Sequence, residues 1–285
     1  MSEFDFIIVG AGSAGCVLAN RLSENGRYSV LLLEAGGSDR KFWLTVPIGY
    51  GKAFYDRNVN WMYMTETDPG LNGRQSYWPR GKALGGSSSI NAMIFVRGHP
   101  SDFDGWEAMG NPGWWWSDVM PYFRKMESSD RGATELRGGE GRFASKARSG
   151  TFILFANPSS KSDSRSAFRE TKNGPSLEGV GIYQITTKDC RRMSDSRAYL
   201  RPAKGRANLR VETGAFAQRI LFEGSHATGV RYRRAGKDYE VRARRKVILS
   251  AGAINSPQLL QLPGVLAPDR SCRIWKFPSS RRSKA

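Results

Sequence analysis

Three glycines near the N-terminus have the spacing of a loop that holds phosphate groups. They lie in the run Gly10-Ala11-Gly12-Ser13-Ala14-Gly15. The first glycine permits a tight turn, the second lets a pyrophosphate approach the backbone, and the third lets a helix pack closely on a strand. The start of a helix also offers unpaired N–H groups and about half a positive charge to the phosphates. The run therefore predicts a dinucleotide site.

The segments around the run have the patterns that such a site needs. Residues 4–9 are a short apolar stretch typical of a parallel strand buried on both faces, and a helical pattern follows that ends near Gly26. Residues 29–33 predict a second strand that ends in Glu34, 19 residues after Gly15. A carboxylate there can accept hydrogen bonds from ribose hydroxyls and disfavours a 2′-phosphate. These patterns leave FAD and NAD as alternatives.

Composition narrows the class of protein. The 285 residues are enough for one large domain or two ordinary ones, and 39% of them are hydrophobic, as in globular proteins. The sequence has no apolar run of the length that crosses a membrane and no signal-peptide pattern at its start. Its three cysteines are far apart and form no CxxC pair, which suits a reducing compartment. We expect a cytoplasmic protein.

The net charge of +18 is unevenly distributed. Six basic residues and no acid follow from Arg270 to the end, and residues 142–172 carry seven basic residues against Asp163 and Glu170. Neither stretch has helical spacing or the pattern of a nucleic-acid module. Charge is the only feature that favours nucleic acid, so we expect no nucleic-acid partner.

A second glycine-rich motif distinguishes between the two cofactors. Residues 79–91 read Pro-Arg-Gly-Lys-Ala-Leu-Gly-Gly-Ser-Ser-Ser-Ile-Asn. The glycine pair allows close approach of the backbone to a planar polar ligand, and the serines supply adaptable donors. This motif resembles the first signature of the glucose–methanol–choline (GMC) oxidoreductases, and the likeness continues to Trp106. Residues 249–260 resemble the second signature of that family, with Ser256 and Pro257 suited to an N-cap and a first helical position.

The resemblance implies FAD as the cofactor. Some members of the family attach FAD covalently through a histidine in the motif at residues 79–91. This sequence has Ile90 at that position, so the resemblance implies non-covalent FAD. Trp61, Tyr63 and Trp78 are candidates for a lid over the cofactor that the sequence alone does not place. The glycine run and the resemblance together indicate these cofactor-binding residues: Gly10, Gly12, Ser13, Ala14, Gly15, Glu34, Ala35, Arg80, Leu84, Gly85, Gly86, Ser87, Ser88, Asn91, Ala92, Ala217, Ala251 and Gly252.

The resemblance also implies a reaction class, oxidation of the CH–OH group of a choline-like or aliphatic alcohol. In the family a histidine removes the hydroxyl proton while hydride passes to flavin N5, and that histidine lies well beyond the second signature. This sequence contains two histidines, His99 near the flavin loop and His226 in an expected turn, and neither matches that position. We therefore assign no catalytic residue and no metal site, and we leave the electron acceptor open. The alternative is a non-catalytic FAD-binding remnant.

Two stretches depart from the family pattern. Residues 142–172 lack its helical pattern, and residues after Leu262 differ from it before the basic tail. Our interpretation is a truncated or frameshifted chain that would not oxidise alcohols efficiently by itself.

The expected fold is α/β. It has an FAD-binding Rossmann-like domain, made of a parallel sheet with helices and a β-meander within residues 209–241, and a fragment of a substrate domain. We assign residues 1–140 and 205–265 to the FAD-binding domain, 141–204 to the substrate-domain segment, and 266–285 to the aberrant tail.

Overall fold

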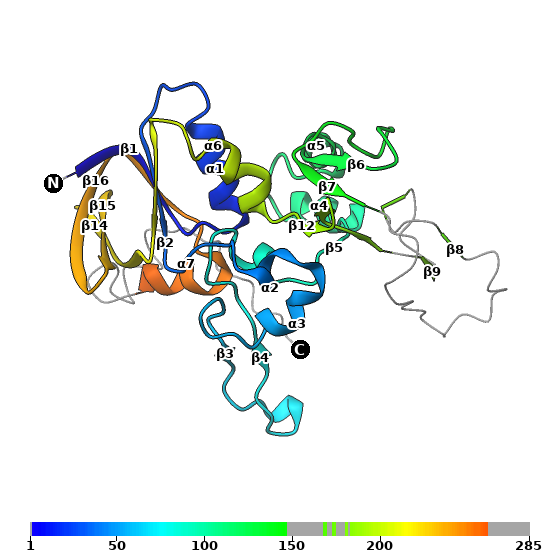
Figure 1. The fold of residues 1–285 in the computed structure, drawn as a ribbon, viewed down its shortest axis with the longest axis horizontal. Helices are drawn as coiled ribbons and strands as arrows, with labels where there is room; N and C mark the ends of the chain where they lie inside the picture. The colour runs from blue at the N-terminus through cyan, green and yellow to red at the C-terminus, as the bar shows by residue number, and fades with distance from the viewer. Residues whose placement is uncertain (1, 147–167, 170–172, 175–179, 182, 262–285) are drawn as a thin grey trace. The chain divides into compact units, whose positions relative to one another are not determined.

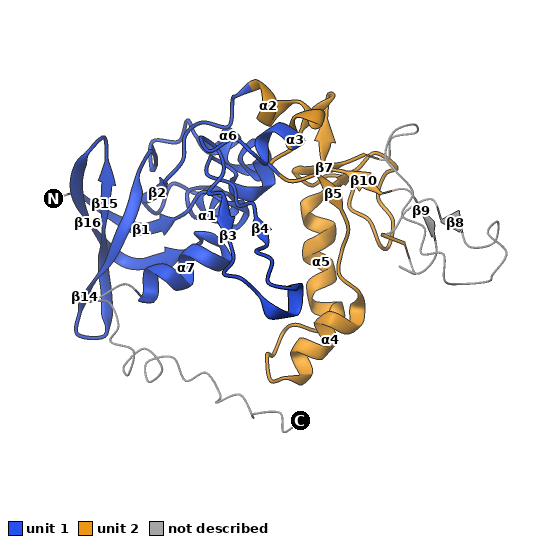
Figure 2. Ribbon diagram, turned by 90° about the horizontal axis from the view of Figure 1, so that it is seen from below, with its two compact units in different colours: residues 1–41, 51–90, 195–285 blue, residues 42–50, 91–194 orange. Residues whose placement is uncertain are grey.

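The computed structural model describes residues 2–146, 168–169, 173–174, 180–181 and 183–261 (Figure 1). Two compact units are coloured separately in Figure 2. Unit 1 takes residues up to 41, residues 51–90 and residues from 195 onward, and unit 2 takes residues 42–50 and 91–194. The domain boundaries expected from the sequence stay a prediction. Residues 266–285 and most of residues 142–172, which the sequence led us to interpret as aberrant, lie outside the described residues.

Unit 1 is organised around a six-stranded sheet with the order β13-β2-β1-β16-β15-β14. β1 (Ser2–Val9) lies between β2 (Val30–Glu34) and β16 (Lys237–Leu249) and is parallel to both. β13 (Leu209–Thr213) extends the parallel part beside β2. The strands expected around residues 4–9 and 29–33 are therefore confirmed, and their buried β-branched and leucine side chains are typical of a sheet covered on both faces.

The remaining strands form the expected β-meander. β14 (Phe216–Glu223) pairs antiparallel with β15 (His226–Arg234), which pairs antiparallel with β16. Gly224 and Gly236 have φ values of 60° and 77° and make the two tight turns. His226 is the first residue of β15 rather than part of the turn, because the turn closes within two residues after Glu223. β16 thus belongs to both parts of the sheet and joins the meander to the parallel strands.

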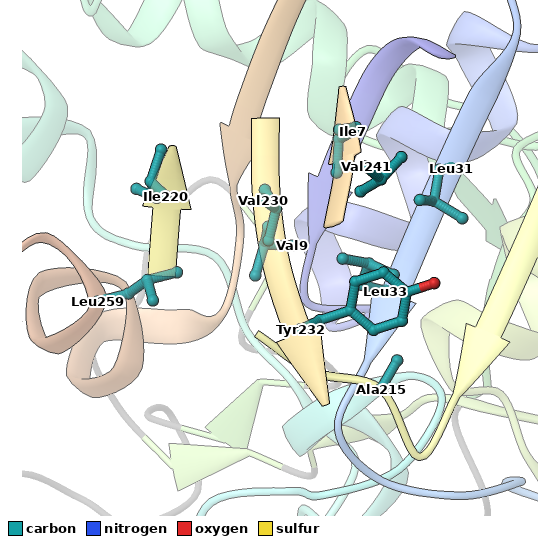
Figure 3. Packing of buried hydrophobic residues seen from close by; sticks show 10 residues of the cluster. All are labelled: Ile7, Val9, Leu31, Leu33, Ala215, Ile220, Val230, Tyr232, Val241 and Leu259. Atoms are coloured by element: carbon teal, nitrogen blue, oxygen red, sulfur yellow. The ribbon is translucent and has the colours of Figure 1, made fainter. Parts of the chain in front are cut away.

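The core of unit 1 brings the sheet and one helix together (Figure 3). Side chains of β1 and β2 pack with those of β14, β15 and β16, and Leu259 enters from α7 (Gly252–Gln261). The buried members of this cluster are Ile7, Val9, Leu31, Leu33, Ala215, Ile220, Val230, Tyr232, Val241 and Leu259. Burying apolar side chains is worth about 1.5–3 kcal/mol for each large residue, so this cluster fixes the strands whose ends form the site.

Two helices begin directly after parallel strands. α1 (Ser13–Leu22) follows β1, and α7 follows β16 after a turn at Gly252, whose φ is 88°. The predicted N-cap at Ser256 is wrong, since the helix starts four residues earlier and Pro257 lies inside it. The Ser256 hydroxyl instead accepts a hydrogen bond from the Ala251 N–H at 3.0 Å, so it ties the turn to the helix from within.

The other elements of unit 1 are short. They are the hairpin of β3 (Tyr63–Met64) and β4 (Tyr77–Trp78), the 3₁₀ turns η2 (Pro69–Leu71) and η3 (Gly86–Ser89), the π-turn η4 (Ser196–Leu200) and α6 (Arg201–Ala203). The chain passes from unit 2 to unit 1 within α3 (Tyr50–Ala53).

Unit 2 contains two longer helices and several short strand pairs. The helices are α4 (Pro100–Ala108) and α5 (Trp116–Met126), with α2 (Phe42–Thr45) and the 3₁₀ turn η1 (Pro47–Gly49) from an earlier segment. The pairs are β5 (Ile94–Phe95) with β10 (Gln184–Ile185), β6 (Glu127–Ser129) with β7 (Phe143–Ser145), β8 (Phe168–Arg169) with β9 (Val180–Gly181), and β11 (Thr187–Lys188) with β12 (Arg191–Arg192).

A buried ionic cluster holds unit 2 together. The Glu127 carboxylate accepts hydrogen bonds from Arg97 Nη2 at 2.6 Å and from Ser145 Oγ at 2.6 Å, and it pairs with Arg137. Burial raises the pKa of Glu127, but the hydrogen bonds from Arg137 and Ser145 and the two positive charges outweigh burial and hold the pKa below its ordinary value. The charged form is therefore the one the folded unit favours.

We predict that Glu127→Gln lowers the free energy of unfolding of unit 2 by about 3–5 kcal/mol, because both arginines stay buried without the charge that neutralises them. Urea unfolding measures the change. Since the folded pKa of Glu127 is lowered, its contribution is full above the ordinary value near 4.3 and is lost as the pH falls through the folded pKa. The wild type should therefore lose stability on acidification more steeply than the variant. Arg231→Gln is the control, because the exposed Arg231–Glu240 pair contributes below about 1 kcal/mol. Equal effects of the two substitutions would contradict this account.

Candidate dinucleotide-binding site

Unit 1 contains a cavity of about 590 Å³, within the ordinary range for a small-molecule site. Its walls come from the ends of β1, β2 and β16, from the starts of α1, α7 and β14, and from η3 and the segment before it. Twelve of the residues expected from the sequence line it: Gly10, Gly12, Ser13, Ala14, Glu34, Ala35, Arg80, Gly86, Ser87, Ala217, Ala251 and Gly252. Segments far apart in the chain thus meet at the carboxyl ends of parallel strands, where ligands bind in open α/β sheets.

The first glycine loop has the geometry that its spacing predicts. Gly10 has a φ of 99°, and a Cβ there would lie 2.6 Å from the Ala251 Cα. A Cβ on Gly15 would lie 1.9 Å from the Gly10 carbonyl oxygen, so only glycine lets α1 pack this closely on the end of β1. Gly12 borders the cavity, and a Cβ there would meet nothing closer than 3.8 Å. The loop is tight on its inner side and open toward the cavity.

The second glycine loop lies directly against the first. The Gly85 N–H donates a hydrogen bond to the Ala11 carbonyl oxygen at 2.7 Å. A Cβ on Gly86, whose φ is 53°, would lie 2.7 Å from the Gly12 Cα. Backbone of both loops therefore borders the cavity at one point, with no side chain between them.

The serines after Gly86 divide into two groups. Ser87 lines the cavity, and its Oγ accepts a hydrogen bond from the Gly81 N–H at 3.1 Å. Ser88 Oγ donates to the Gly85 carbonyl oxygen at 2.6 Å, and Ser89 Oγ donates to the Leu84 carbonyl oxygen at 2.7 Å. Buried hydroxyls need partners, and these two stabilise the turn itself. Four residues expected at the cofactor are not among those that line the cavity: Gly15, Leu84, Gly85 and Ser88.

Glu34 connects the end of β2 to the first loop. Its two carboxylate oxygens accept hydrogen bonds from the Ala11 N–H at 2.9 Å and from the Gly36 N–H at 2.8 Å. Burial raises the pKa of this carboxyl although both amides and the charge of Lys82 act in the opposite direction. Glu34 also lines the cavity, so the same residue shapes the loop and borders the space in front of it.

Among the further residues that line the cavity are Trp61, Phe216 and Asn255. Of these, sequence reasoning assigned no role to Asn255. The Trp61 ring stacks on Tyr63 at 6.0 Å between centroids, and the Tyr63 hydroxyl donates to Asn255 Oδ1 at 2.9 Å. The sequence named Trp61 and Tyr63 as lid candidates, but no pattern paired them with α7. Trp78 is half-exposed, with the Arg80 guanidinium 5.1 Å from its ring.

The remaining candidate residues lie elsewhere. Asn91 and Ala92 belong to unit 2, where Asn91 Oδ1 accepts a hydrogen bond from Arg192 at 2.8 Å, and their contact with a cofactor stays a prediction. His99 caps α4 through its ring nitrogen, which accepts from the Ser101 N–H at 3.2 Å, and His226 is exposed at the start of β15. Within the described part of the chain, no group of three metal-ligating side chains is present, and no helix is long and apolar enough to cross a membrane.

Comparison with curated proteins gives close relatives. Mouse mitochondrial choline dehydrogenase is 43% identical over 271 residues, which cover 92% of this chain and 46% of that protein. The oxygen-dependent choline dehydrogenase of Vibrio vulnificus is 44% identical over 269 residues, which cover 92% of this chain and 48% of that protein. The chain thus spans about half the length of the curated relatives it matches.

Solved structures with a similar fold also match most of this chain. The pyridoxine 4-oxidase from Mesorbium loti matches with a TM-score of 0.80 and 32% identity over 90% of this chain and 51% of that one. The formate oxidase of Aspergillus oryzae, whose FAD modification has been studied, matches with a TM-score of 0.77 and 27% identity over 91% of this chain and 47% of that one.

The comparison with family models confirms the resemblance that the glycine motifs indicated. The model described as GMC oxidoreductase matches residues 4–271, a span that contains both glycine loops and the turn into α7. The α/β fold with its parallel strands and meander is confirmed as well. The chain therefore belongs to the GMC oxidoreductases, a family that binds FAD.

Proposed function

We propose that unit 1 holds FAD non-covalently in its cavity, and that the whole protein uses this FAD to oxidise the CH–OH group of a small alcohol. The observation that carries the proposal is the contact of the two glycine loops beside the start of α1, where backbone alone borders the cavity. A Cβ at Gly10 or Gly86 would collide with backbone, as expected of a cradle shaped for close approach to phosphate oxygens.

Each part of the cavity has a proposed role toward FAD. Gly12, Ser13, Ala14 and Gly86 hold the pyrophosphate, because they border the cavity where the N-terminus of α1 offers its partial positive charge. Glu34 accepts hydrogen bonds from the ribose, and the backbone at Ala217 faces adenine. The wall toward the flavin is proposed to consist of Arg80, Ser87, Ala251 and Gly252. Ala35 is proposed to lie beside the ribose. Four residues that do not line the cavity are proposed to stabilise the conformation of the two loops: Gly15, Leu84, Gly85 and Ser88.

Attachment is proposed to be non-covalent because of Ile90. This side chain closes the second motif and is buried, 2% exposed. It has no nucleophilic atom to form a bond with a flavin. Packing is the one role that a buried isoleucine can perform there.

The substrate class is inferred from the relatives. Proteins named choline dehydrogenase match 92% of this chain at over 40% identity, which favours a choline-like alcohol. The chemistry that FAD supplies when bound is acceptance of a hydride at flavin N5. This chain's contribution is to bind and orient the cofactor and to keep the loops closed around it. Cytoplasmic location stays a prediction from the cysteine pattern.

A second candidate is a chain that holds FAD without turning over an alcohol. The observation that favours it is the position of the histidines. His99 is used in the capping box of α4, and His226 is exposed on the meander, so neither is assigned the role of general base. A general base contributes about 10²- to 10⁴-fold in rate, which makes its presence measurable.

One experiment separates these candidates. The purified chain is loaded with FAD, and its visible spectrum is recorded before and after anaerobic addition of choline or a medium-chain alcohol. Bleaching of the flavin band supports alcohol oxidation. A stable flavin band that does not bleach supports the non-catalytic candidate. A chain that binds no FAD contradicts the proposal at its first step.

We predict that Gly86→Ala weakens FAD binding at least tenfold, or about 1.4 kcal/mol. The new methyl group would lie 2.7 Å from the Gly12 Cα, so the two loops must separate where the pyrophosphate is proposed to bind. Titration of FAD followed by quenching of its fluorescence measures the affinity. Gly205→Ala is the matched control, since a Cβ at Gly205 meets nothing within 4 Å. Equal affinity of Gly86→Ala and the control would show that the loop contact does not shape the site.

We also predict that Glu34→Gln weakens FAD binding by about 1–3 kcal/mol, which is roughly 5- to 150-fold. The amide keeps one acceptor oxygen, so it cannot serve both the Ala11 and Gly36 N–H groups. The same titration gives the affinity, and thermal unfolding of the apo-protein gives the accompanying loss of stability. Glu24→Gln is the control, because Glu24 forms an exposed pair with Arg21 outside the cavity. Unchanged affinity in Glu34→Gln would remove Glu34 from the site.

A further inference from the structure

Gln218 of β14 has a side-chain amide whose oxygen is buried without a hydrogen bond. Among the described residues, no donor lies within hydrogen-bond distance of its Oε1 atom. The residue as a whole is half-buried, and it lines the cavity. Buried polar groups normally have a partner, so an unpaired oxygen in a cavity wall indicates a partner from outside the chain, either a water or a donor on the ligand.

An irregularity in β14 accounts for the position of Gln218. Ala217 is paired with Tyr232 and Arg219 is paired with Arg231, so Gln218 is an extra residue between two neighbouring pairs. This is the two-against-one pairing of a β-bulge, which bends the strand, changes the direction of a side chain and is frequent beside binding sites. The regular alternation of β14 is therefore interrupted at a residue that borders the cavity.

The start of β14 lies beside the residue proposed to bind the ribose. The Ala215 N–H donates a hydrogen bond to the Glu34 carbonyl oxygen at 2.9 Å. Phe216 and Ala217 continue the cavity wall, and the backbone at Ala217 is proposed to face adenine. Gln218 is three residues beyond Ala215, which is roughly 10 Å along an extended chain. Its amide therefore belongs to the part of the wall assigned to the base.

The strand carries α7 on its inner side, where Ile220 of β14 packs with Leu259 (Figure 3). Two polar side chains that α7 contributes to the wall already have partners. Asn255 Oδ1 accepts a hydrogen bond from the Tyr63 hydroxyl at 2.9 Å, and Ser256 Oγ accepts from a backbone N–H at 3.0 Å. The Gln218 amide differs from them, because its acceptor is still available beside the two donors of its nitrogen.

We propose that the Gln218 amide recognises the base of the dinucleotide and selects adenine. The inference rests on the proposed function and deepens it. Adenine has an amino donor at N6 beside an acceptor at N7, and a glutamine amide matches this pair with one acceptor and one donor. Oε1 accepts from the N6 amino group and Nε2 donates to N7. The terminal torsion of glutamine is broad, so Oε1 can turn from its buried position toward the base.

The test compares FAD with an analogue in which a carbon atom replaces N7 of adenine. Calorimetric titration of the apo-protein gives the affinity for each. We expect the wild type to bind FAD about three- to tenfold more tightly than the 7-deaza analogue, the effect of one neutral hydrogen bond. Gln218→Leu should lose this preference, and so should Gln218→Glu, which keeps the size of the side chain but has no donor for N7. Gln258→Leu is the matched control, because Gln258 lines the same cavity but is exposed, and it should keep the preference.

The stability of the apo-protein gives an independent readout. Because Oε1 has no partner among the described residues, Gln218→Leu removes a buried unpaired acceptor and should unfold at or above the wild-type temperature. A clearly lower temperature would assign the amide a structural role and overturn the inference. A preference for FAD that is absent from the wild type, or unchanged in both Gln218 variants, also overturns it and leaves the proposed function standing. Absence of FAD binding by the wild type overturns both.

Discussion

The contact between the two glycine loops is the constraint on which the site depends. Gly86 can lie against Gly12 only because neither residue has a side chain, and the Gly85 N–H holds the loops together through the Ala11 carbonyl oxygen. Glu34 fixes the same stretch from the other side by binding the Ala11 N–H. Residue 11 is thus held through both of its backbone polar groups, so the start of α1 is fixed before any ligand arrives. Such preorganisation lowers the entropy that binding has to overcome.

The parallel arrangement of strands in the sheet of unit 1 makes the contact between the two glycine loops possible. β1, β2 and β16 are parallel neighbours, so their carboxyl ends lie at one edge and deliver the first loop, Glu34 and the turn into α7 to the same place. β16 has a second task as the last strand of the meander, and β14 begins beside the cavity at Phe216. The apolar cluster between the sheet and Leu259 therefore stabilises both the fold and the geometry of the cavity.

Local patterns predicted much of this arrangement. Short-range rules predicted the strand around residues 4–9, the strand that ends at Glu34, the meander and the tight packing of Gly15, and the structure confirms them. The predicted start of α7 was wrong. Ser256 and Pro257 have the residue types of a helix start, but the helix begins at Gly252. The Tyr63–Asn255 hydrogen bond could not be predicted, since it joins residues 192 positions apart. Side-chain pairings at that separation depend on the finished fold.

Hydrogen exchange with and without FAD, resolved by mass spectrometry, tests most directly whether one cavity in unit 1 holds the cofactor. We predict that FAD slows exchange together in the segments around Gly12, Gly86, Ala217 and Ala251, which lie far apart in the sequence and all line the cavity. The segment around Glu127 in unit 2 serves as the internal reference and should exchange at the same rate in both samples. Protection confined to other segments, or absent from the two glycine loops while FAD is bound, would contradict the account.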